Sequence, residues 1–318
     1  MSLKHEVLLR LRQAGGDFVS GQELADTLSV SRAAVWKAIT ALRSDGAVIE
    51  SVTNRGYRLA KGCDLLSAEL ISASLRHSDL RVTVFDSIDS TNNEAKRRLA
   101  GGFTGAELVV AAEQTAGRGR MGRTFYSPAQ TGLYMSLALA CPDGFENAVC
   151  STTAAAVAVV RAIEQLTPAH PLIKWVNDIY LDGRKICGIL TEGVTDFESG
   201  TLTCIVIGIG VNLHTRDFPE EIGMTAASLG EAAPGRCVLS AAIADELLDI
   251  VGALPDRSFM DFYREKSLVL GRRVTYSSAD GAHSAEAVGI DDFGGLIVRK
   301  NDGNLTTLSS GEISVRLQ

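Results

Sequence analysis

The sequence lacks any long apolar run, and none of its apolar segments reaches the length that a membrane-spanning helix needs. The first residues include Lys4, His5 and Glu6, and no signal-like apolar core follows them. These two absences predict a protein that enters no membrane and is not exported. We therefore expect a cytoplasmic location and no membrane partner.

Cysteine and histidine are sparse and separated. The six cysteines never form a C-x-x-C pair, and their mostly apolar neighbours are typical of reduced thiols that fill a core. The five histidines are scattered along the chain, so the sequence shows no cluster of nitrogen and sulfur ligands. We expect a reducing compartment and no metal site built from protein clusters.

The composition that is present fits a globular protein of several domains. The chain has 318 residues, of which 46% are hydrophobic, and this length suggests two or three domains. The net charge is −7, but residues 1–60 hold eight Lys or Arg against six Asp or Glu. That end therefore carries +2 and the remainder −9, which is compatible with a nucleic-acid reader at the N-terminus. The asymmetry is too small to decide the matter alone.

The most informative segment is 117–123, which contains three arginines and three glycines. Glycine lets a backbone approach a ligand closely, and arginine offers a planar fork of donors to carboxylate or phosphate oxygens. The segment also matches G-x-G-x-x-G, but that fingerprint requires a helix to begin at the third glycine. Pro128, Gly132 and another strand-like run follow instead. We interpret the segment as an anion-binding loop, with a solvated basic turn as the alternative.

The N-terminal residues predict a winged helix-turn-helix. Ser20 and Glu23 form a capping box for a helix to about position 28, and Ser31 caps a second helix that ends near Gly46. Two short strands, 48–52 and 57–59, then form a wing. Such a fold places its second helix in a major groove, and two-fold pairing on a palindromic site would add specificity. A protein-interaction module built in the same way is the alternative.

The DNA-facing residues follow from the positions that the core does not use. Residues 35, 38, 39 and 42 share the core face of the second helix. Trp36 lies at the edge of this face, so we expect it to pack rather than to stack on bases. The residues predicted to face DNA are Ser31, Arg32, Ala33, Lys37, Thr40 and Arg43 on or before the helix, and Asn54 and Arg55 at the wing tip.

Beyond residue 62 the pattern alternates between strands and helices. Strands are expected at 81–86, 107–113, 133–140, 172–181, 184–191 and 201–213, and helices at 91–100, 151–166 and 238–254. A capping box is expected at Thr91 and Glu94. The short connections between strands favour much antiparallel pairing. We therefore predict a mixed α/β domain rather than a doubly wound one.

Asp182 and Gly183 predict a tight type I′ hairpin. In an undisturbed register Asp178 opposes Cys187, and Asp178 and Lys185 are diagonal neighbours about 7–8 Å apart on one face. A carboxylate and an ammonium in apolar strands make sense if an anion or a metal lies between them. The alternative is an edge hairpin with solvated charges, and a bulge would break this register.

The strand 205–211 carries Gly208 and Gly210 and ends at Asn212. Glycines inside a strand mark the close approach of a ligand or of another backbone. A polar residue at the end of the strand fits the rim of a pocket. A plain crossing of two sheets is the alternative.

These motifs together resemble those of the bifunctional biotin protein ligases that also repress the biotin operon. The resemblance covers nearly the whole chain, and its order makes it specific although each motif alone is weak. The matching segments are 90–92 (Ser-Thr-Asn), Gln114, 117–123, 174–178 (Lys-Trp-Val-Asn-Asp), 185–190 and 208–212. The family often has arginine at the place of Met121, proline at that of Val176 and alanine at that of Cys187.

The resemblance implies a two-step reaction. The carboxylate of biotin attacks the α-phosphate of ATP to give biotinyl-5′-adenylate and pyrophosphate, and a lysine of a biotin carboxyl carrier protein then displaces AMP. Two anions must meet, so arginines and Mg²⁺ would neutralise charge, and a closing loop would exclude water. The adenylate would also act as corepressor, and a homodimer would occupy operator DNA of a biotin biosynthesis operon.

The resemblance also implies a role for each matching residue. The catalytic residues would be Arg118, Arg120, Asp178 and Lys185, with Mg²⁺ entering with ATP near Asp178. The biotin site would be Ser90, Thr91, Asn92, Gln114, Arg118, Gly119, Arg120 and Lys185. The ATP and adenylate site would be Arg120, Arg123, Phe125, Asn177, Asp178 and Asn212.

The expected architecture is a multidomain α+β chain. A winged helix-turn-helix would span 1–62, a biotin- and ATP-binding catalytic domain of the class II synthetase-like type 63–270, and an SH3-like β-barrel 271–318, closing with the motif at 310–316. Two other functions remain open: a sensor that binds a small acid and regulates DNA without catalysis, and a ligase for lipoate or octanoyl groups. The arginines and Lys185 favour an enzyme, and the 174–178 motif favours biotin.

Overall fold

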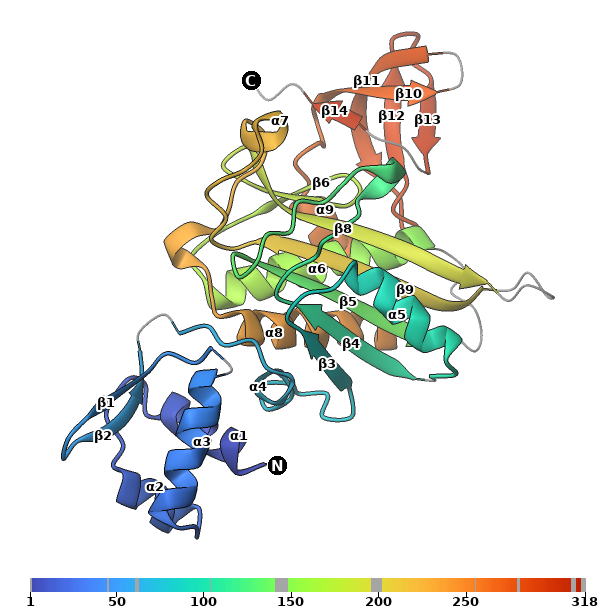
Figure 1. The fold of residues 1–318 in the computed structure, drawn as a ribbon. Helices are drawn as coiled ribbons and strands as arrows, with labels where there is room; N and C mark the ends of the chain where they lie inside the picture. Colours follow the sequence, from blue (N-terminus) through green and yellow to red (C-terminus); the bar gives the residue numbers. More distant parts are fainter. Residues whose placement is uncertain are drawn as a thin grey trace.

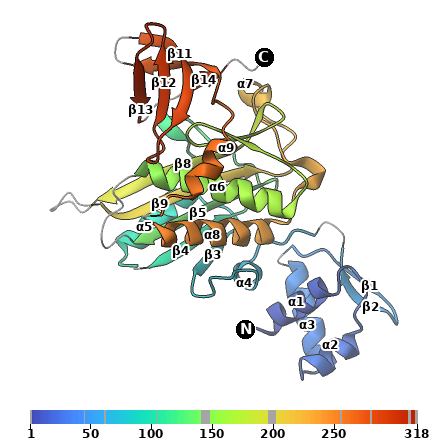
Figure 2. The same ribbon diagram turned by 180° about the vertical axis from the view of Figure 1, so that it is seen from behind.

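The protein consists of a small helical domain, a central α/β domain and a C-terminal sheet (Figure 1). The computed structural model describes residues 2–44, 46–60, 63–103, 105–140, 148–195, 202–254, 256–278, 281–309 and 313–315. The two smaller domains lie at opposite ends of the central one in both views (Figures 1 and 2). Within these residues no helix combines the length and the apolarity that a membrane span requires.

The N-terminal domain is a winged helix, as predicted. It contains α1 (Leu3–Gln13), α2 (Gly21–Thr27), α3 (Arg32–Ser44), β1 (Ile49–Val52) and β2 (Gly56–Leu59). Ser20 Oγ accepts from the Glu23 amide at 3.0 Å, and Ser31 Oγ accepts from the Ala34 amide at 3.1 Å, so both predicted caps are confirmed. The sequence analysis made no prediction for α1, which packs Val7, Leu8 and Leu11 against α3.

The central domain contains a seven-stranded mixed sheet in the order β3-β4-β5-β9-β8-β7-β6. Only the β3–β4 pair is parallel among these neighbours, which confirms the predicted antiparallel character. The strands are β3 (Arg81–Phe85), β4 (Ala106–Ala111), β5 (Gly132–Ala140), β6 (Leu172–Lys174), β7 (Asp178–Leu181), β8 (Arg184–Thr195) and β9 (Leu202–Asn212).

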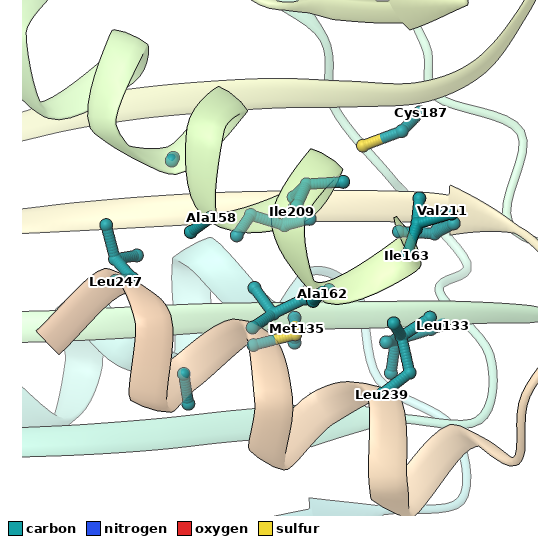
Figure 3. Packing of buried hydrophobic residues seen from close by; sticks show 14 of the residues in the cluster. Leu133, Met135, Ala158, Ala162, Ile163, Cys187, Ile209, Val211, Leu239 and Leu247 are labelled. Carbon is teal, nitrogen blue, oxygen red and sulfur yellow. The ribbon is translucent and has the colours of Figure 1, made fainter. Parts of the chain in front are cut away.

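Helices cover both faces of this sheet. On one face lies α5 (Thr91–Ala100), and on the other lie α6 (Ala148–Leu166) and α8 (Arg236–Ala253) (Figure 2). The apolar core lies between the sheet and α6 and α8, where side chains of β5 and β9 meet those of both helices (Figure 3). The shorter elements are α4 (Ala68–Ser72), α7 (Glu220–Gly223), α9 (Phe259–Glu265), and the 3₁₀ turns η1 (Arg120–Gly122) and η2 (Gly230–Ala232).

Two local predictions are wrong. The expected strand 172–181 is two antiparallel strands, β6 and β7, in which Lys174 opposes Asp178 across a turn. The N-cap of α5 is Ser90 rather than Thr91, and its side chain makes no capping bond. The hydroxyl and amide of Thr91 both donate to Gln114 Oε1, so they are used to join α5 to the end of β4.

The tight turn at Asp182 and Gly183 is confirmed, with φ values of 50° and 76° that a type I′ turn requires. Tyr180 opposes Lys185 as predicted, but a bulge then places Asp178 opposite Gly188 instead of Cys187. The predicted register is wrong because one extra residue on β8 reverses the faces beyond it. Cys187 therefore packs in the core beside α6 (Figure 3).

The C-terminal domain is a five-stranded antiparallel sheet in the order β13-β12-β11-β10-β14. Its strands are β10 (Arg273–Ser278), β11 (Gly281–Ile290), β12 (Leu296–Lys300), β13 (Leu305–Leu308) and β14 (Ile313–Val315). The expected barrel closure stays a prediction. Of the predicted closing motif 310–316, residues 310–312 and 316 lie outside the described residues.

Candidate functional site

A cavity of about 460 Å³ opens on the α5 face of the central sheet, a volume that suits a small-molecule ligand. The N-terminal end of α5, strands β8 and β9, and the arginine loop 117–123 surround it. Most of the predicted site residues line it together: Ser90, Thr91, Asn92, Gln114, Arg118, Gly119, Arg120, Phe125, Asn177 and Lys185. Residues from distant parts of the sequence therefore meet in one place.

One end of the cavity is an ordered network of neutral polar groups. Gln114 Oε1 accepts from Thr91, and its Nε2 donates to Ser127 Oγ at 3.0 Å. Ser136 Oγ lies 2.7 Å from Thr91 Oγ1 and 2.6 Å from Asn92 Oδ1. Ser136 is fully buried on β5, and the sequence analysis missed it. A single serine inside the apolar strand 133–140 was the available signal.

The two glycines of β9 are confirmed as points of close approach. A Cβ on Gly208 would overlap Asn92 Oδ1, and a Cβ on Gly210 would overlap the ring of Phe125. The absence of side chains at these two positions lets α5 and the aromatic ring lie directly over the strand. The cavity therefore has a flat, narrow floor between its polar and charged ends.

The other end of the cavity is cationic, and each of its cations has a protein partner. Arg118 Nη2 lies 2.8 Å from a carboxylate oxygen of Glu192, and Arg120 Nη1 donates to Asn177 Oδ1 at 3.0 Å. Lys185 Nζ lies 2.7 Å from Asp178 Oδ1, in an ion pair whose angles do not make it a hydrogen bond. The predicted pairing of Lys185 and Asp178 is therefore present despite the changed register.

Three predicted residues do not line this cavity. Asp178 reaches it through Lys185, whereas the Arg123 carbonyl accepts from the Gly119 amide at 2.7 Å and closes the loop on itself. Asn212 is buried, and its Nδ2 donates to the Ala227 carbonyl at 3.0 Å. Asn212 thus fixes the segment after β9 rather than forming the pocket rim that the sequence suggested.

The predicted thiol and metal chemistry of the site is limited. Cys187 is fully buried, and burial raises the pKa of its thiol far above the ordinary value. Across the part of the chain that the structure describes, no three His, Cys, Asp or Glu side chains are grouped to hold a metal ion. A Mg²⁺ ion bound here would need oxygen ligands from its substrate, with Asp178 as the adjacent carboxylate.

The DNA-facing surface differs from the prediction at two residues. Trp36 is 57% exposed and lines a groove with Arg32, Ala33 and Asn54, so the expectation that it packs in the core is wrong. Arg43 donates to the Ile49 carbonyl at 2.7 Å and ties α3 to the wing instead of facing outward.

The wing tip is stiffened by an aromatic ring. Arg55 lies over the Phe18 ring at 4.4 Å, and Arg58 lies over the same ring at 4.5 Å. These contacts hold the predicted DNA-facing Arg55 at the edge of the groove that contains Trp36.

A winged helix joined to an α/β domain with a cationic small-molecule site defines a DNA-binding protein with a ligand-binding or catalytic domain. Comparisons with known proteins identify the family. A family model described as the biotin/lipoate A/B protein ligase family matches residues 84–212. An HTH domain model matches 4–58, and a biotin protein ligase C-terminal domain model matches 269–316.

Full-length relatives agree with these matches. The bifunctional ligase/repressor BirA of Bacillus subtilis is 35% identical over 312 residues, which is 95% of each chain. BirA of Escherichia coli is 32% identical over 95% of this chain and 94% of its own. The solved structure of the Aquifex aeolicus biotin protein ligase with biotin and ATP has a TM-score of 0.64 and 28% identity, over 75% of this chain and 99% of that one. The chain belongs to the biotin protein ligase family, in its group of bifunctional ligase/repressors.

Proposed function

We propose that the protein activates biotin with ATP to biotinyl-5′-adenylate, transfers the biotinyl group to a lysine of a carrier protein, and represses transcription when the adenylate is bound. The observation that supports this most directly is the cavity with a neutral polar end, a flat apolar floor and a cationic end. Biotin has the same sequence of groups: a ureido ring, an apolar body and a carboxylate. The 35% identity to a ligase/repressor over 95% of the chain supports the double function.

The polar end suits the ureido ring. The ring offers one carbonyl acceptor and two N–H donors, and the network of Ser90, Thr91, Asn92 and Gln114 contains both donors and acceptors. Because Ser136 and Ser127 already hold Thr91, Asn92 and Gln114, these groups are oriented before the ligand arrives. Such preorganisation reduces the cost of ordering the site on binding.

The cationic end suits the meeting of two anions. Arg120 pairs with a neutral amide, so its charge remains available to the carboxylate of biotin and the phosphate of the adenylate. Lys185 stands opposite, in the cavity lining, with Asp178 behind it. Both nucleophiles come from the substrates, the biotin carboxylate and the carrier lysine, so the chain itself need supply only orientation and charge.

The remaining adenylate contacts follow from position. Phe125 lies against Gly188 and Gly210 at the cavity, where its ring offers a surface to the nucleotide. Asn177 holds Arg120, and Arg123 braces the loop from within. Mg²⁺ supplies charge neutralisation when bound with ATP, and Asp178 is the carboxylate placed to contact it.

The N-terminal domain provides the repressor function. We propose that Arg32, Ala33 and Lys37 of α3 and Asn54 and Arg55 of the wing contact operator DNA, with Ser31 and Thr40 beside them. Trp36 joins this set because its exposed ring lines the same groove. Arg43 leaves it because its guanidinium is used within the domain.

The assembly and location complete the proposal. The protein would act on DNA as a homodimer, because a two-fold pair of winged helices reads a palindromic site. The carrier would be the biotin carboxyl carrier protein of acetyl-CoA carboxylase, and the location the cytoplasm, where ATP, DNA and carrier occur together. The domain boundaries would be at 62/63 and 270/271, close to the family matches at 4–58 and 269–316.

One experiment tests the ligase function against its rivals. The protein is incubated with ATP, Mg²⁺, a carrier domain and either biotin or lipoate, and the carrier is analysed by streptavidin blot and mass spectrometry. We expect biotinylation that requires ATP. Lipoate transfer without biotin transfer would support the related acyl ligase, and adenylate binding with no transfer of either acid would support a sensor.

A further inference from the structure

Glu192 on β8 has no role in the sequence analysis, yet it connects three parts of the site. Its carboxylate accepts from Asn92 Nδ2 at 2.8 Å and from Lys96 Nζ at 3.0 Å, both on α5. It also accepts from Arg118 Nη2 of the arginine loop, at 2.8 and 3.0 Å to its two oxygens. Its side chain is 23% exposed. Helix, sheet and loop therefore meet at one carboxylate.

The rigid side of this junction holds the carboxylate in place without the loop. Asn92 and Lys96 belong to α5, and Asn92 also donates to the Leu190 carbonyl at 3.2 Å. Burial alone would raise the pKa of Glu192, but the donors Asn92 and Lys96 and the charge of Arg118 hold it below the ordinary value. Glu192 is thus an oriented anion that faces the loop at neutral pH.

The loop itself is a short hairpin that needs an anchor. The Phe125 amide donates to the Gly117 carbonyl at 2.9 Å, and Arg118 forms a bridge with Thr124. At its tip, Met121 is 77% exposed and has a positive φ of 54°. The contact of Arg118 with Glu192 ties one arm of this hairpin to the sheet.

The partners of the two loop arginines separate their roles. Arg120 contacts a neutral amide, so its full charge is left for a ligand. Arg118 contacts a carboxylate, and Glu192 neutralises its charge. An arginine that is already paired with a carboxylate is a poor choice for neutralising a second anion. Arg118 therefore fits an anchor better than the ligand-covering role that the sequence suggested.

We propose that Glu192 is a positioning residue that holds the arginine loop over the cavity through Arg118 and so slows the release of the bound adenylate. The anchoring does not depend on the identity of the ligand. The effect on the adenylate rests on the proposed function. Two measurements therefore test the two parts separately.

The first measurement is limited trypsin digestion of the ligand-free protein, in which cleavage after Arg120 and Arg123 is followed by mass spectrometry. Glu192→Gln preserves the shape and an acceptor oxygen but removes the charge, and we expect about tenfold faster cleavage. Glu94→Gln is the matched control, because Glu94 is also an ion-paired carboxylate near α5 but contacts Arg97 and Arg98 away from the loop. The control should cleave at the wild-type rate.

A double-mutant cycle shows whether Glu192 acts through Arg118. Arg118→Gln should accelerate cleavage after Arg120 and Arg123 as much as Glu192→Gln does, and the double variant should be no faster than either. Effects that multiply in the double variant would mean that Glu192 acts through Asn92 or Lys96, and the proposal would be wrong. Wild-type cleavage rates in Glu192→Gln, with an unchanged thermal melt, would also overturn it.

The second measurement is the release of preformed biotinyl-adenylate from wild type and Glu192→Gln. We expect release to be about tenfold faster in the variant, together with faster cleavage. Faster cleavage with unchanged release would refute the effect on the adenylate. If the wild-type protein forms no adenylate, the proposed function fails, while the digestion still decides whether Glu192 anchors the loop.

Discussion

Replacing Gly210 with alanine is the sharpest test of the floor of the cavity. The new methyl group would overlap the ring of Phe125, with ring carbon Cζ only 2.6 Å from the Cβ position. Phe125 has little freedom to move, because its ring packs edge-on against Tyr134 at 6.5 Å and its amide is bonded to Gly117. Overpacking of this kind costs about 1–3 kcal/mol of the free energy of unfolding.

The ligand should feel the same displacement. Phe125 lines the cavity, so a ring pushed away from β9 moves toward the space that biotin and the nucleotide need. We expect Gly210→Ala to weaken biotin binding by about tenfold or more, which corresponds to about 1.4 kcal/mol. Calorimetric titration with biotin and denaturant unfolding measure the two effects separately.

The chain contains a matched control at Gly252 near the end of α8. A Cβ there meets no atom within 4 Å, so Gly252→Ala should leave biotin affinity unchanged. Alanine should even stabilise the fold there, by up to about 1 kcal/mol, because glycine is a weak helix former. If Gly210→Ala binds biotin normally and unfolds like wild type, Phe125 does not need the bare strand, and our account of the floor fails.

The remaining predictions concern the charged end, the DNA surface and the buried thiols. Lys185→Ala should abolish adenylate formation, and normal pyrophosphate release in this variant would remove Lys185 from the catalytic set. Trp36→Ala should weaken operator binding about tenfold in mobility shifts without changing the melt, whereas the equally exposed Val48→Ala outside the groove should bind normally. At pH 8 iodoacetamide should spare Cys187 and Cys237 in the folded protein, since burial raises the pKa of Cys187 strongly and that of Cys237 to about 11; alkylation of Cys187 with loss of activity would contradict this.

Features with a local cause were predictable from the sequence. The caps at Ser20 and Ser31 and the turn at Asp182 each depend on a few neighbouring residues, and each was confirmed. The strand glycines at 208 and 210 also announced a close approach, because glycine inside an apolar strand has few other causes. Local chemistry was sufficient to place these elements and to indicate the site.

Features that depend on distant partners were missed. A bulge on β8 leaves no local signature, so the predicted opposition of Asp178 and Cys187 was wrong by one residue. Thr91 looked like a helix cap until Gln114, 23 positions away, was seen to accept from it. Trp36 looked like a core residue because helical periodicity assigns a face but does not say what covers it.

Glu192 illustrates the limit most clearly. Along β8 a glutamate is unremarkable, because a half-buried strand commonly alternates polar and apolar residues. Its meaning comes from Arg118, which is 74 positions away and reaches it only because β8 lies beside β9 and beneath α5. The sequence could suggest that the arginines bind an anion, but it could not show that one of those anions is part of the protein. The distinction matters chemically, because an arginine already paired with a carboxylate orients the loop, whereas one paired with an amide keeps its charge for the reaction.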